Sequence, residues 1–493
     1  MSTTLEHVDV LVVGAGLSGI DAAHHLQALC PGKTYAILEQ RERIGGTWDL
    51  FRYPGIRSDS DMLTMGYSFR PWTDPRAISP GAEIREYIET AAREERIDRK
   101  IRFGHTARRA SWSSEEARWT VEGTRLSPEG RDETFALTCG FLFSCAGYYR
   151  YSAGYTPDLP GLERFAGRVV HPQAWPDDLD HAGQRVPVVG SGATAVTLVP
   201  ALAKTAAHVT MLQRSPTWIV SMPEKDPVAN ALRAVLPARW AYRLGRLKNI
   251  VLMSLLYRMS RRFPRLVGRV LLAQVRRQVG PGVDASTHFA PRYGPWEQRL
   301  CLVPDGDLFR ALREGRASVA TGTIETFTET GVRLTSGEEI AADLVVTATG
   351  LVMQLLGGVT VDVDGRPVDP GRCLSYKGVM LSGVPNLAAV FGYVNASWTL
   401  KADLVCSWVC RLLLEMDRRG ARVVIPTAGD EAPAGPFVEG FTPGYVMRAL
   451  DQWPKQGRKA PWRVRQDYFR DTLDLGWGPV AGDALVFSGP GRM

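Results

Sequence analysis

The stretch VDVLVVGAGLSGIDAA, residues 8–23, decides the fold of this chain. Its first six residues are mostly β-formers, as expected of a strand that is buried on both faces of a parallel sheet. Three glycines follow at spacings that each have a physical reason. Gly14 permits a tight turn, Gly16 lets the backbone approach a pyrophosphate, and Gly19 lets the next helix pack closely on the strand. The pattern predicts the start of a dinucleotide-binding unit.

The residues after this loop complete the unit. Residues 20–29 show a helical pattern, and the amino terminus of such a helix would face the phosphates. Residues 35–39 form the next predicted strand, which ends in Glu39, a side chain able to accept hydrogen bonds from ribose hydroxyls. Strand, glycine turn, helix, strand and terminal acid together favour nucleotide binding over a chance glycine turn.

A second glycine loop, GSGATA, follows an apolar run further along the chain. Gly190, Gly192 and Ala195 occupy its three loop positions, and alanine at the third is common where NADP is bound. The next predicted strand is followed by Arg214, at the place where the first unit has Glu39. An acid would repel a 2′-phosphate, whereas arginine can bind it with two hydrogen bonds. We therefore predict that the second loop binds NADPH; a surface arginine is the plainer interpretation.

One of the two other specific motifs lies between the glycine loops. Residues 165–176, FAGRVVHPQAWP, match the pattern FxGxxxHxxxW(P/D) at Phe165, Gly167, His171 and Trp175. That pattern is the fingerprint of Baeyer–Villiger monooxygenases. Related flavin monooxygenases that oxidise amines and sulfides have Tyr or Phe where Trp175 stands. The chain thus resembles the Baeyer–Villiger type of class B flavoprotein monooxygenase, and over its whole length most resembles the ethionamide monooxygenase group.

The second motif supports the same resemblance. Residues 45–59 match [AG]GxWxxxx[FY]P[GM]xxxD, from a glycine at the first position to Asp59 at the last. In the family this loop lies along the flavin, and its aspartate sits beside the active-site arginine. The resemblance therefore implies that Gly46, Thr47 and Trp48 bind the cofactor, and that Asp59 both borders it and takes part in catalysis.

The resemblance implies further site residues. In the family an arginine in a segment such as 288–309 reaches the flavin, and Arg299 is the match, although several relatives have Lys where this chain has Gln298. A structural arginine paired with a carboxylate is the alternative. Residues 392–399 would bring backbone amides and Asn395 to the isoalloxazine. FAD is assigned to the first glycine loop because flavoproteins of this kind place their FAD loop first.

The same resemblance implies a mechanism. NADPH reduces FAD, the reduced flavin takes up O2 as a C4a-peroxide, and the anionic peroxide attacks a ketone whose adduct rearranges to an ester. Arg299 supplies a cation that does not deprotonate, and Asp59 orients it. Thio compounds would also be oxygenated. His171 and Trp175 link domain motion to cofactor position, without a role in proton transfer.

Two alternatives stay open at this point. One is a flavin-containing N/S-monooxygenase that forms no ester, and the other is a flavoprotein NADPH oxidase or reductase. A disulfide reductase is disfavoured because the seven cysteines include no CxxC pair, and no metal-ligand spacing occurs either. The sequence leaves open the native ketone or thio compound and the oligomeric state.

The motifs predict an α/β fold with two Rossmann-like dinucleotide-binding domains, for FAD and NADPH, and a helical insertion. The FAD domain is expected to be discontinuous, comprising residues 1–150 and 352–493. Residues 151–220 and 296–351 form the predicted NADPH domain, and residues 221–295 the insertion.

Some local expectations concern the structure around the motifs. Residues 107–137 predict a small antiparallel meander, and residues 141–147 a separate buried strand that returns to the first sheet. Four tyrosines between residues 148 and 155 lie in the expected linker, and no chemistry is assigned to them. Pro187 cannot donate a ladder hydrogen bond, which leaves the start of the predicted strand, residues 186–189, open; the first position of the strand is one place that suits a proline.

Charge and composition bound the location and the partners. The net charge is +7, yet residues 231–280 alone hold twelve Arg or Lys and no Asp or Glu. A solvated helix face is the slightly favoured interpretation of this block, and weak peripheral membrane binding is the sharper one. Nothing else resembles a nucleic-acid module. Few cysteines and no signal-like amino terminus favour the cytoplasm, and the longest central apolar run, residues 250–257, is too short to span a bilayer.

Overall fold

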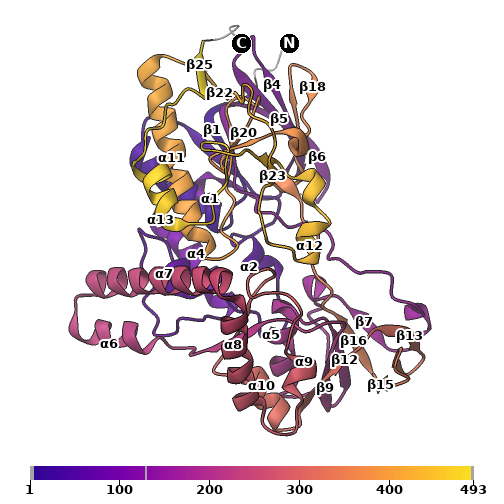
Figure 1. Cartoon of the computed structure of the whole chain (residues 1–493). Coiled ribbons are helices and arrows are strands. Elements are labelled where there is room, and N and C mark those ends of the chain that lie inside the picture. Colours follow the sequence, from indigo (N-terminus) through magenta and orange to yellow (C-terminus); the bar gives the residue numbers. More distant parts are fainter. Residues whose placement is uncertain (1–4, 128–129, 490–493) are drawn as a thin grey trace.

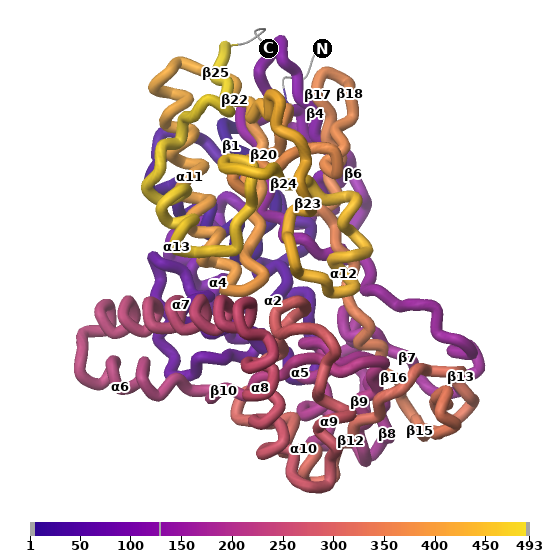
Figure 2. Tube along the Cα trace, viewed as in Figure 1, coloured from indigo at the N-terminus to yellow at the C-terminus, as the bar shows by residue number. Residues whose placement is uncertain are grey.

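A computed structural model describes residues 5–127 and 130–489. Figure 1 shows two sheet-containing units, one above the other, with a group of helices beside their junction. The upper unit is assembled from both ends of the chain, and Figure 2 shows the indigo amino-terminal and yellow carboxy-terminal segments lying together there. The lower unit is formed by the middle of the chain.

The amino-terminal segment of the upper unit folds as its sequence pattern predicts. A strand, a glycine turn, a helix and a second strand follow one another, and β1 and β2 pair in parallel from Val10–Tyr35 to Val13–Leu38. The elements are β1 (His7–Val13), α1 (Leu17–Leu29), β2 (Tyr35–Leu38), α2 (Thr47–Leu50), α3 (Met62–Met65), α4 (Gly81–Glu94), β3 (Ile101–Arg102), β4 (His105–Ser113), β5 (Arg118–Leu126) and β6 (Asp132–Ser144).

One strand joins the two parts of the large sheet. The expected meander is present as β4, β5 and β6, but the separate strand predicted for residues 141–147 is the second half of β6. The first half of β6 pairs antiparallel with β5, and its second half pairs parallel with β1 on one side and with β21 on the other. Gly140 is the residue at which the alternating meander pattern passes into the fully buried FLFS run, and it stays within the strand, so β6 does not break.

The carboxy-terminal part completes the upper unit. Helix α11 packs against α1 and buries its apolar faces in the same core, with both Cys406 and Cys410 fully buried. The elements are β17 (Thr360–Val363), β18 (Arg366–Pro367), β19 (Ser375–Tyr376), β20 (Met380–Leu381), β21 (Leu387–Ala389), α11 (Trp398–Arg419), β22 (Val423–Pro426), β23 (Gly435–Pro436), α12 (Gly444–Met447), β24 (Lys455–Gln456), α13 (Tyr468–Asp471) and β25 (Leu485–Ser488).

The lower unit holds a second parallel sheet in the order β12-β9-β8-β16-β7. A small antiparallel sheet, β13-β14-β15, lies at its side. The elements are β7 (Arg168–Val170), β8 (Arg185–Val189), α5 (Ala193–Leu202), β9 (His208–Gln213), β10 (Ile219–Met222), β11 (Cys301–Pro304), α10 (Asp307–Arg313), β12 (Ala317–Thr321), β13 (Ile324–Thr328), β14 (Gly331–Leu334), β15 (Glu339–Ala341) and β16 (Leu344–Thr347).

Pro187 lies inside its strand and not at the first position. It is the third of five residues in β8, a strand with neighbours on both sides. The ladder to β9 includes all five residues, whereas the ladder to β16 begins only at Val188. A proline is tolerated here because pairing is complete on one side and starts after the proline on the other.

The predicted helices of the insertion form between β10 and β11. They are α6 (Pro227–Val235), α7 (Ala238–Arg262), α8 (Pro264–Val279) and α9 (Ala285–His288). Helix α7 packs on α3 of the upper unit, while Val275 and Val279 of α8 enter the core of the lower unit. The helices therefore touch both units. Among residues 5–127 and 130–489, no helix is long and apolar enough to cross a membrane.

The chain passes between the units twice, and the two passages pair with each other. Tyr149 forms an antiparallel bridge with Met353, Arg150 N–H donates to the Val352 carbonyl at 2.8 Å, and Tyr155 N–H donates to the Gly350 carbonyl at 3.0 Å. The domain limits predicted near residues 150 and 352 fall within these passages and remain a prediction.

Gly19 is the position of the first glycine loop with least room. A Cβ there would lie 1.8 Å from the carbonyl oxygen of Gly14. We expect Gly19→Ala to force α1 away from β1, and the variant to purify with little bound flavin. Flavin absorbance per polypeptide measures this. Gly192→Ala is the matched control, because a Cβ at Gly192 meets nothing within 4 Å; equal flavin content in both variants would contradict the close-packing role.

Candidate functional site

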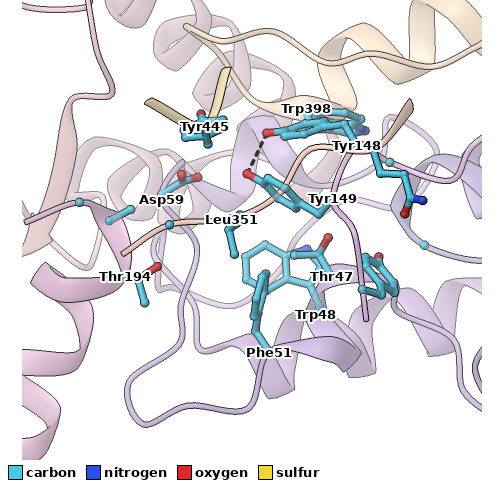
Figure 3. Close-up of a pocket in the computed structure, with 18 of the residues that line it drawn as sticks. Thr47, Trp48, Phe51, Asp59, Tyr148, Tyr149, Thr194, Leu351, Trp398 and Tyr445 are labelled. Carbon is cyan, nitrogen blue, oxygen red and sulfur yellow. Dashed lines mark hydrogen bonds between the residues drawn. The ribbon is translucent and has the colours of Figure 1, made fainter. Parts of the chain in front are cut away.

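A cavity of about 720 Å³ lies between the two units and reaches both glycine loops. Figure 3 shows part of its wall, with Thr47 and Trp48 on one side, Thr194 from α5 on another, and Tyr148, Tyr149 and Trp398 above. The two loops, far apart in sequence, thus open into one space. Such a space suits two nucleotides placed end to end.

The first glycine loop is shaped for close backbone approach. Gly14 has φ +103°, and a Cβ there would lie 2.7 Å from the Cys145 carbonyl oxygen. Gly16 lines the cavity beside Gly46, whose Cβ, if present, would lie 3.1 Å from the Gly16 Cα. Gly19 does not line the cavity and serves the packing of α1 on β1. The cradle at the amino terminus of α1 fits a pyrophosphate.

Glu39 borders this cradle, and two backbone N–H groups already use part of the hydrogen-bonding capacity of its carboxylate. Its Oε2 accepts from Ala15 N–H at 2.8 Å, and its Oε1 accepts from Arg41 N–H at 2.9 Å. Burial raises the pKa of the Glu39 carboxyl, against these two hydrogen bonds. A carboxylate has about four lone-pair sites, so capacity remains for ribose hydroxyls.

The loop of residues 45–59 follows the cavity wall. Gly45 and Gly46 have φ +133° and +56°, which places the start of α2 next to the first glycine loop. Gly46, Thr47, Trp48 and Asp59 all line the cavity. The motif therefore presents a short helix and an aspartate to the space where the two units meet.

The second glycine loop lines the opposite part of the cavity. Gly190 has φ +140°, and a Cβ there would lie 2.3 Å from the Ala348 carbonyl oxygen. Gly192 lines the cavity, whereas Ala195, in the first turn of α5, is fully buried. The exposed Arg214 also lines the cavity, at the end of β9, and its position is that of a 2′-phosphate ligand in this type of fold.

Arg299 and Asp59 form an ion pair inside the cavity. Arg299 Nη2 donates to Asp59 Oδ2, and Arg299 Nη1 donates to the Val394 carbonyl at 3.2 Å. The arginine side chain is 29% exposed, and the exposed part faces the cavity. Burial opposes the charge of Arg299, but the Asp59 carboxylate outweighs it, so the pKa of the guanidinium lies above its ordinary value. The site thus holds a permanent cation.

Three tyrosines surround this ion pair, and the sequence analysis missed them. Tyr148 and Tyr149 line the cavity with hydroxyl oxygens 3.1 Å apart, and Tyr148 lies against the Trp398 ring at 5.0 Å between centroids. Tyr445 lies nearby. Burial raises the pKa of all three hydroxyls, so they stay protonated and can donate hydrogen bonds. The cluster of tyrosines just after a strand at the sheet's carboxyl edge was the available signal.

An aromatic chamber adjoins the ion pair. Its volume is about 60 Å³, and it shares Tyr148, Arg299, Tyr393, Trp398 and Tyr445 with the main cavity. The remaining wall is mostly apolar and comes largely from the carboxy-terminal part: Met353, Phe391, Gly392, Val394, Phe437, Val438, Phe441, Val446, Leu450 and Trp453. Apolar walls beside a fixed cation can hold an apolar molecule with one polar group.

The four fingerprint residues lie outside the wall of this cavity. Phe165 is buried in a small core against Phe327, and a Cβ at Gly167 would meet the Phe165 ring and the Asp343 carbonyl oxygen. Trp175 packs on the core of the lower unit. These residues shape the fold around the junction and do not touch the cavity.

His171 fastens the paired passages. Its Nδ1 accepts from Gln173 N–H at 3.1 Å, which leaves Nε2 to donate to the Gly350 carbonyl at 3.2 Å. A Cβ at Gly154 would lie 1.9 Å from the His171 ring, so the other passage also presses on it. Burial lowers the pKa of the imidazole. The neutral ring therefore holds the two passages together, with a hydrogen bond to one and a packing contact with the other.

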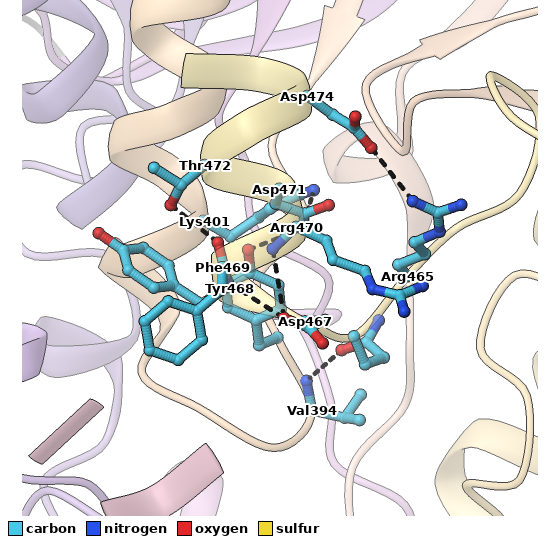
Figure 4. A network of polar contacts seen from close by, with 12 residues as sticks. Val394, Lys401, Arg465, Asp467, Tyr468, Phe469, Arg470, Asp471, Thr472 and Asp474 are labelled. Atoms are coloured by element: carbon cyan, nitrogen blue, oxygen red, sulfur yellow. Dashed lines mark hydrogen bonds and ion pairs between the residues drawn. The ribbon is translucent and has the colours of Figure 1, made fainter. Parts of the chain in front are cut away.

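Asn395 does not face the cavity. Its Nδ2 donates to the Gln466 carbonyl at 2.9 Å, and Gln466 Oε1 accepts from Val394 N–H at 3.0 Å. Figure 4 shows this segment beside Val394, with Asp467 capping α13. The carboxy-terminal segment thus holds the loop whose Val394 carbonyl receives Arg299.

A buried ion pair anchors that segment. Lys401 Nζ lies 2.7 Å from Asp471 Oδ2, and Tyr393 donates its hydroxyl to the same carboxylate oxygen at 2.7 Å. Both charged side chains are buried, at 5% and 9% exposure. Because Lys401 belongs to α11 and Tyr393 to the loop before it, this contact ties helix, loop and carboxy-terminal segment together (Figure 4).

One polar cluster lies outside the cavity. Asp21, His25 and Asp403 could together hold a metal ion. His25 Nε2 already lies 3.0 Å from Asp403 and 3.7 Å from Asp21, and burial raises the pKa of the Asp21 carboxyl. The contact between His25 and Asp403 already uses ligand atoms that an ion would need, so we assign no metal to this cluster.

Residues 7–232 match the flavin-binding monooxygenase-like family model. The FAD-containing monooxygenase EthA of Mycobacterium tuberculosis is 53% identical over 485 residues, which cover 98% of each chain. The chain therefore belongs to the class B flavoprotein monooxygenases. Within that class it is a relative of EthA, and the expectation of a flavoprotein monooxygenase is confirmed.

Solved structures support the fold. A polycyclic ketone monooxygenase from the fungus Thermothelomyces thermophila matches with a TM-score of 0.78 at 18% identity, over 99% of this chain and 91% of the other. A steroid monooxygenase bound to NADP matches with a TM-score of 0.75 at 22% identity, over 98% and 100%. These likenesses confirm the predicted α/β fold with two dinucleotide-binding units.

The buried Lys401–Asp471 pair generates a stability prediction. Asp471→Asn should lower the free energy of unfolding by about 3–5 kcal/mol, because it leaves the buried lysine without a counter-charge. Urea unfolding of the flavin-loaded protein measures the loss. Asp417→Asn is the control, since Asp417 pairs with Lys33 at the surface and its loss should cost less than about 1 kcal/mol. Similar losses in both variants would refute the anchoring role.

Proposed function

We propose that this monooxygenase converts ketones to esters, inserting one atom of O2 beside the carbonyl carbon. The balanced reaction takes one ketone, O2, NADPH and a proton, and yields one ester, NADP+ and water. The observation that carries the proposal is the Arg299–Asp59 pair, held inside a cavity that both glycine loops share. A fixed cation there favours a reactive anion over its protonated form.

The residues assigned to each cofactor follow the two halves of the cavity. FAD would be held by Gly14, Gly16 and Glu39, and by the loop residues Gly46, Thr47, Trp48 and Asp59. NADPH would be held by Gly190, Gly192 and Arg214. Bound FAD supplies the oxygen-transfer chemistry, with electrons from NADPH. Gly19 and Ala195 would pack the helix after each loop and would not touch the cofactors. The proposed FAD domain comprises residues 1–150 and 352–493, and the proposed NADPH domain comprises residues 151–220 and 296–351.

Arg299 is the residue we assign to the chemical step. Its guanidinium does not deprotonate, so it offers a positive charge at every working pH. Asp59 fixes the direction of Nη2, and the Val394 carbonyl fixes Nη1. A ketone carbonyl in the aromatic chamber would meet this cation and the protonated tyrosines around it.

The aromatic chamber indicates the substrate class. Its wall offers many apolar contacts and few polar ones, so ketones with an apolar body are favoured over small hydrophilic ones. Thio compounds of similar shape would be oxygenated at sulfur in the same space. Closure of the junction would exclude water, and the paired passages with His171 keep the two units in register.

The chemical role of Arg299 is tested by substitution. Arg299→Ala should bind FAD and still oxidise NADPH, but ester formed per NADPH should fall about a hundredfold or more, because the charge that stabilises the reactive anion is gone. Gas chromatography of products from a phenyl ketone, alongside H2O2 assay, measures the split. Ester formation at the normal yield by Arg299→Ala would overturn the assignment. If the unsubstituted enzyme formed sulfoxide from a thio compound but no ester from the ketone, an N/S-monooxygenase would be favoured.

Asp59 gives a graded version of the same test. Asp59→Asn keeps a hydrogen-bond acceptor for Arg299 but removes the negative charge. We expect a smaller loss of ester yield than in Arg299→Ala, with flavin content unchanged. Asp417→Asn is the control, because Asp417 pairs with Lys33 at the surface, neither residue lines the cavity, and the change should leave the yield intact.

The coenzyme assignment rests on Arg214. Arg214→Ala should raise the KM for NADPH about ten- to a hundredfold and change that for NADH little, since a charge-assisted contact costs about 1.5–3 kcal/mol to lose. Steady-state kinetics with both coenzymes measures the difference. The exposed Arg164, away from the cavity, provides the control Arg164→Ala. An equal rise for both coenzymes would count against 2′-phosphate recognition.

A further inference from the structure

The outer face of α7 carries a row of exposed apolar side chains. Trp240, Leu244, Leu247, Val251 and Leu255 are 57%, 42%, 51%, 48% and 55% exposed. Their spacing of three and four residues puts them on one side of the helix. A contiguous row of large apolar side chains in water marks an interaction surface more often than a scatter of single ones does. We call these five residues the α7 outer face.

The opposite side of α7 is fixed to the upper unit. Tyr242 donates its hydroxyl to the Tyr67 carbonyl at 3.0 Å, and Asn249 Nδ2 donates to Asp61 Oδ1 at 2.8 Å. Ile250 is buried. With this side anchored, the helix has no way to turn the outer face inward without breaking these contacts. Figure 1 shows α7 at the edge of the molecule.

Positive charge surrounds the outer face. Residues 231–280 hold twelve Arg or Lys and no acid. Within the described part of the chain, only Lys248 and Arg258 of these twelve form ion pairs with a carboxylate, to Asp226 and Asp467, which leaves 12 − 2 = 10 without one. Nine of these ten arginines lie on α7 and α8, and Arg233 lies on α6; Arg246 is turned toward the upper unit, where it donates to the Leu63 and Gly66 carbonyls. The excess charge is therefore local and not neutralised by the protein.

Aromatic rings stand at both ends of α7, each under an arginine. The Arg243 guanidinium lies 5.7 Å from the Trp240 ring centroid, and the Arg262 guanidinium lies 5.1 Å from that of Phe263. Phe263 is 44% exposed. Aromatic and arginine side chains have an apolar body and a polar end, and this combination suits the boundary between lipid chains and headgroups.

We propose that the α7 outer face binds the surface of an anionic lipid bilayer, with the helix lying in the plane of the headgroups. The apolar row enters the boundary layer, and the arginines contact lipid phosphates. A second copy of this chain fits less well, because two faces with the same excess of positive charge repel each other. Nucleic acid would leave the Leu and Val side chains in water, since they offer nothing to phosphates.

Vesicle co-sedimentation of the flavin-loaded enzyme tests the proposal. We expect it to sediment with vesicles that contain phosphatidylglycerol at low salt, where the Debye length is about 30 Å at 0.01 M, and to be released at 1 M salt, where it is about 3 Å. Pure phosphatidylcholine vesicles should retain little. No sedimentation with anionic vesicles at low salt would overturn the proposal.

Two sets of variants separate the contributions. Replacing Leu247, Val251 and Leu255 together by Ser should reduce vesicle binding at least about tenfold, with NADPH oxidation and flavin content unchanged. Replacing Arg239, Arg243 and Arg262 by Gln should reduce binding to anionic vesicles at least about tenfold.

Matched controls lie elsewhere on the surface. Leu126→Ser with Val486→Ser removes apolar side chains of similar exposure, 48% and 47%, and should leave vesicle binding intact. Arg164, Arg168 and Arg372 replaced by Gln remove the same charge from other exposed positions. If either control reduced binding as much as its α7 counterpart, binding would depend on overall charge or stickiness and the proposal would fail.

The alternative occupants have their own outcomes. A concentration-dependent dimer in sedimentation velocity that the Ser variant abolishes, without vesicle binding, would make the outer face a contact between copies and would refute the lipid assignment. Retention of a short DNA duplex that the Arg→Gln variant loses and the Ser variant keeps, again without vesicle binding, would assign the charge to nucleic acid instead. Vesicle binding is measured without ester formation, so either proposal can fail while the other still stands.

Discussion

A guanidinium in a cavity of low polarity must be held by a counter-charge, and here two distant parts of the chain supply the partners of Arg299. Asp59 comes from the loop after the first βαβ unit, the Val394 carbonyl from the loop before α11, and Arg299 itself from the segment before β11. The two sheets and the carboxy-terminal segment place these groups within hydrogen-bond reach. If any of them shifts, the charge is left without its partners in a site that water does not fully solvate.

Much of the fold follows from residues whose constraints are local. Gly14, Gly19 and Gly190 need backbone conformations or contacts that other residues do not allow, so the spacing of the glycine loops identifies them without knowledge of the rest. The motif of residues 45–59 is similarly self-contained. These patterns are sufficient for the two nucleotide-binding units, for the cavity wall they build and for the placement of Asp59 near it. The class of enzyme could be predicted from the sequence for the same reason.

What the sequence did not provide depends on contacts across long distances. The amide of Asn395 is turned away from the cavity because Gln466, 71 positions later, receives it. Tyr148 and Tyr149 border the cavity only because the two passages pair there. The position of Pro187 within β8 depends on where β16 begins to pair. Composition and periodicity do not register such partners, since each pattern describes one segment at a time.

The double passage between the units has a mechanical consequence. A single connecting strand lets two bodies swivel about it, whereas two strands joined by hydrogen bonds form a ribbon, which bends across its flat face and resists torsion. His171 is hydrogen-bonded to one edge of this ribbon. We therefore expect the two nucleotide-binding units to move relative to each other by bending of the ribbon and not by twisting about it. Opening and closing of the cavity by this bending would leave the two cofactors aligned along the bending axis, so that they would return to the same relative position after each turnover.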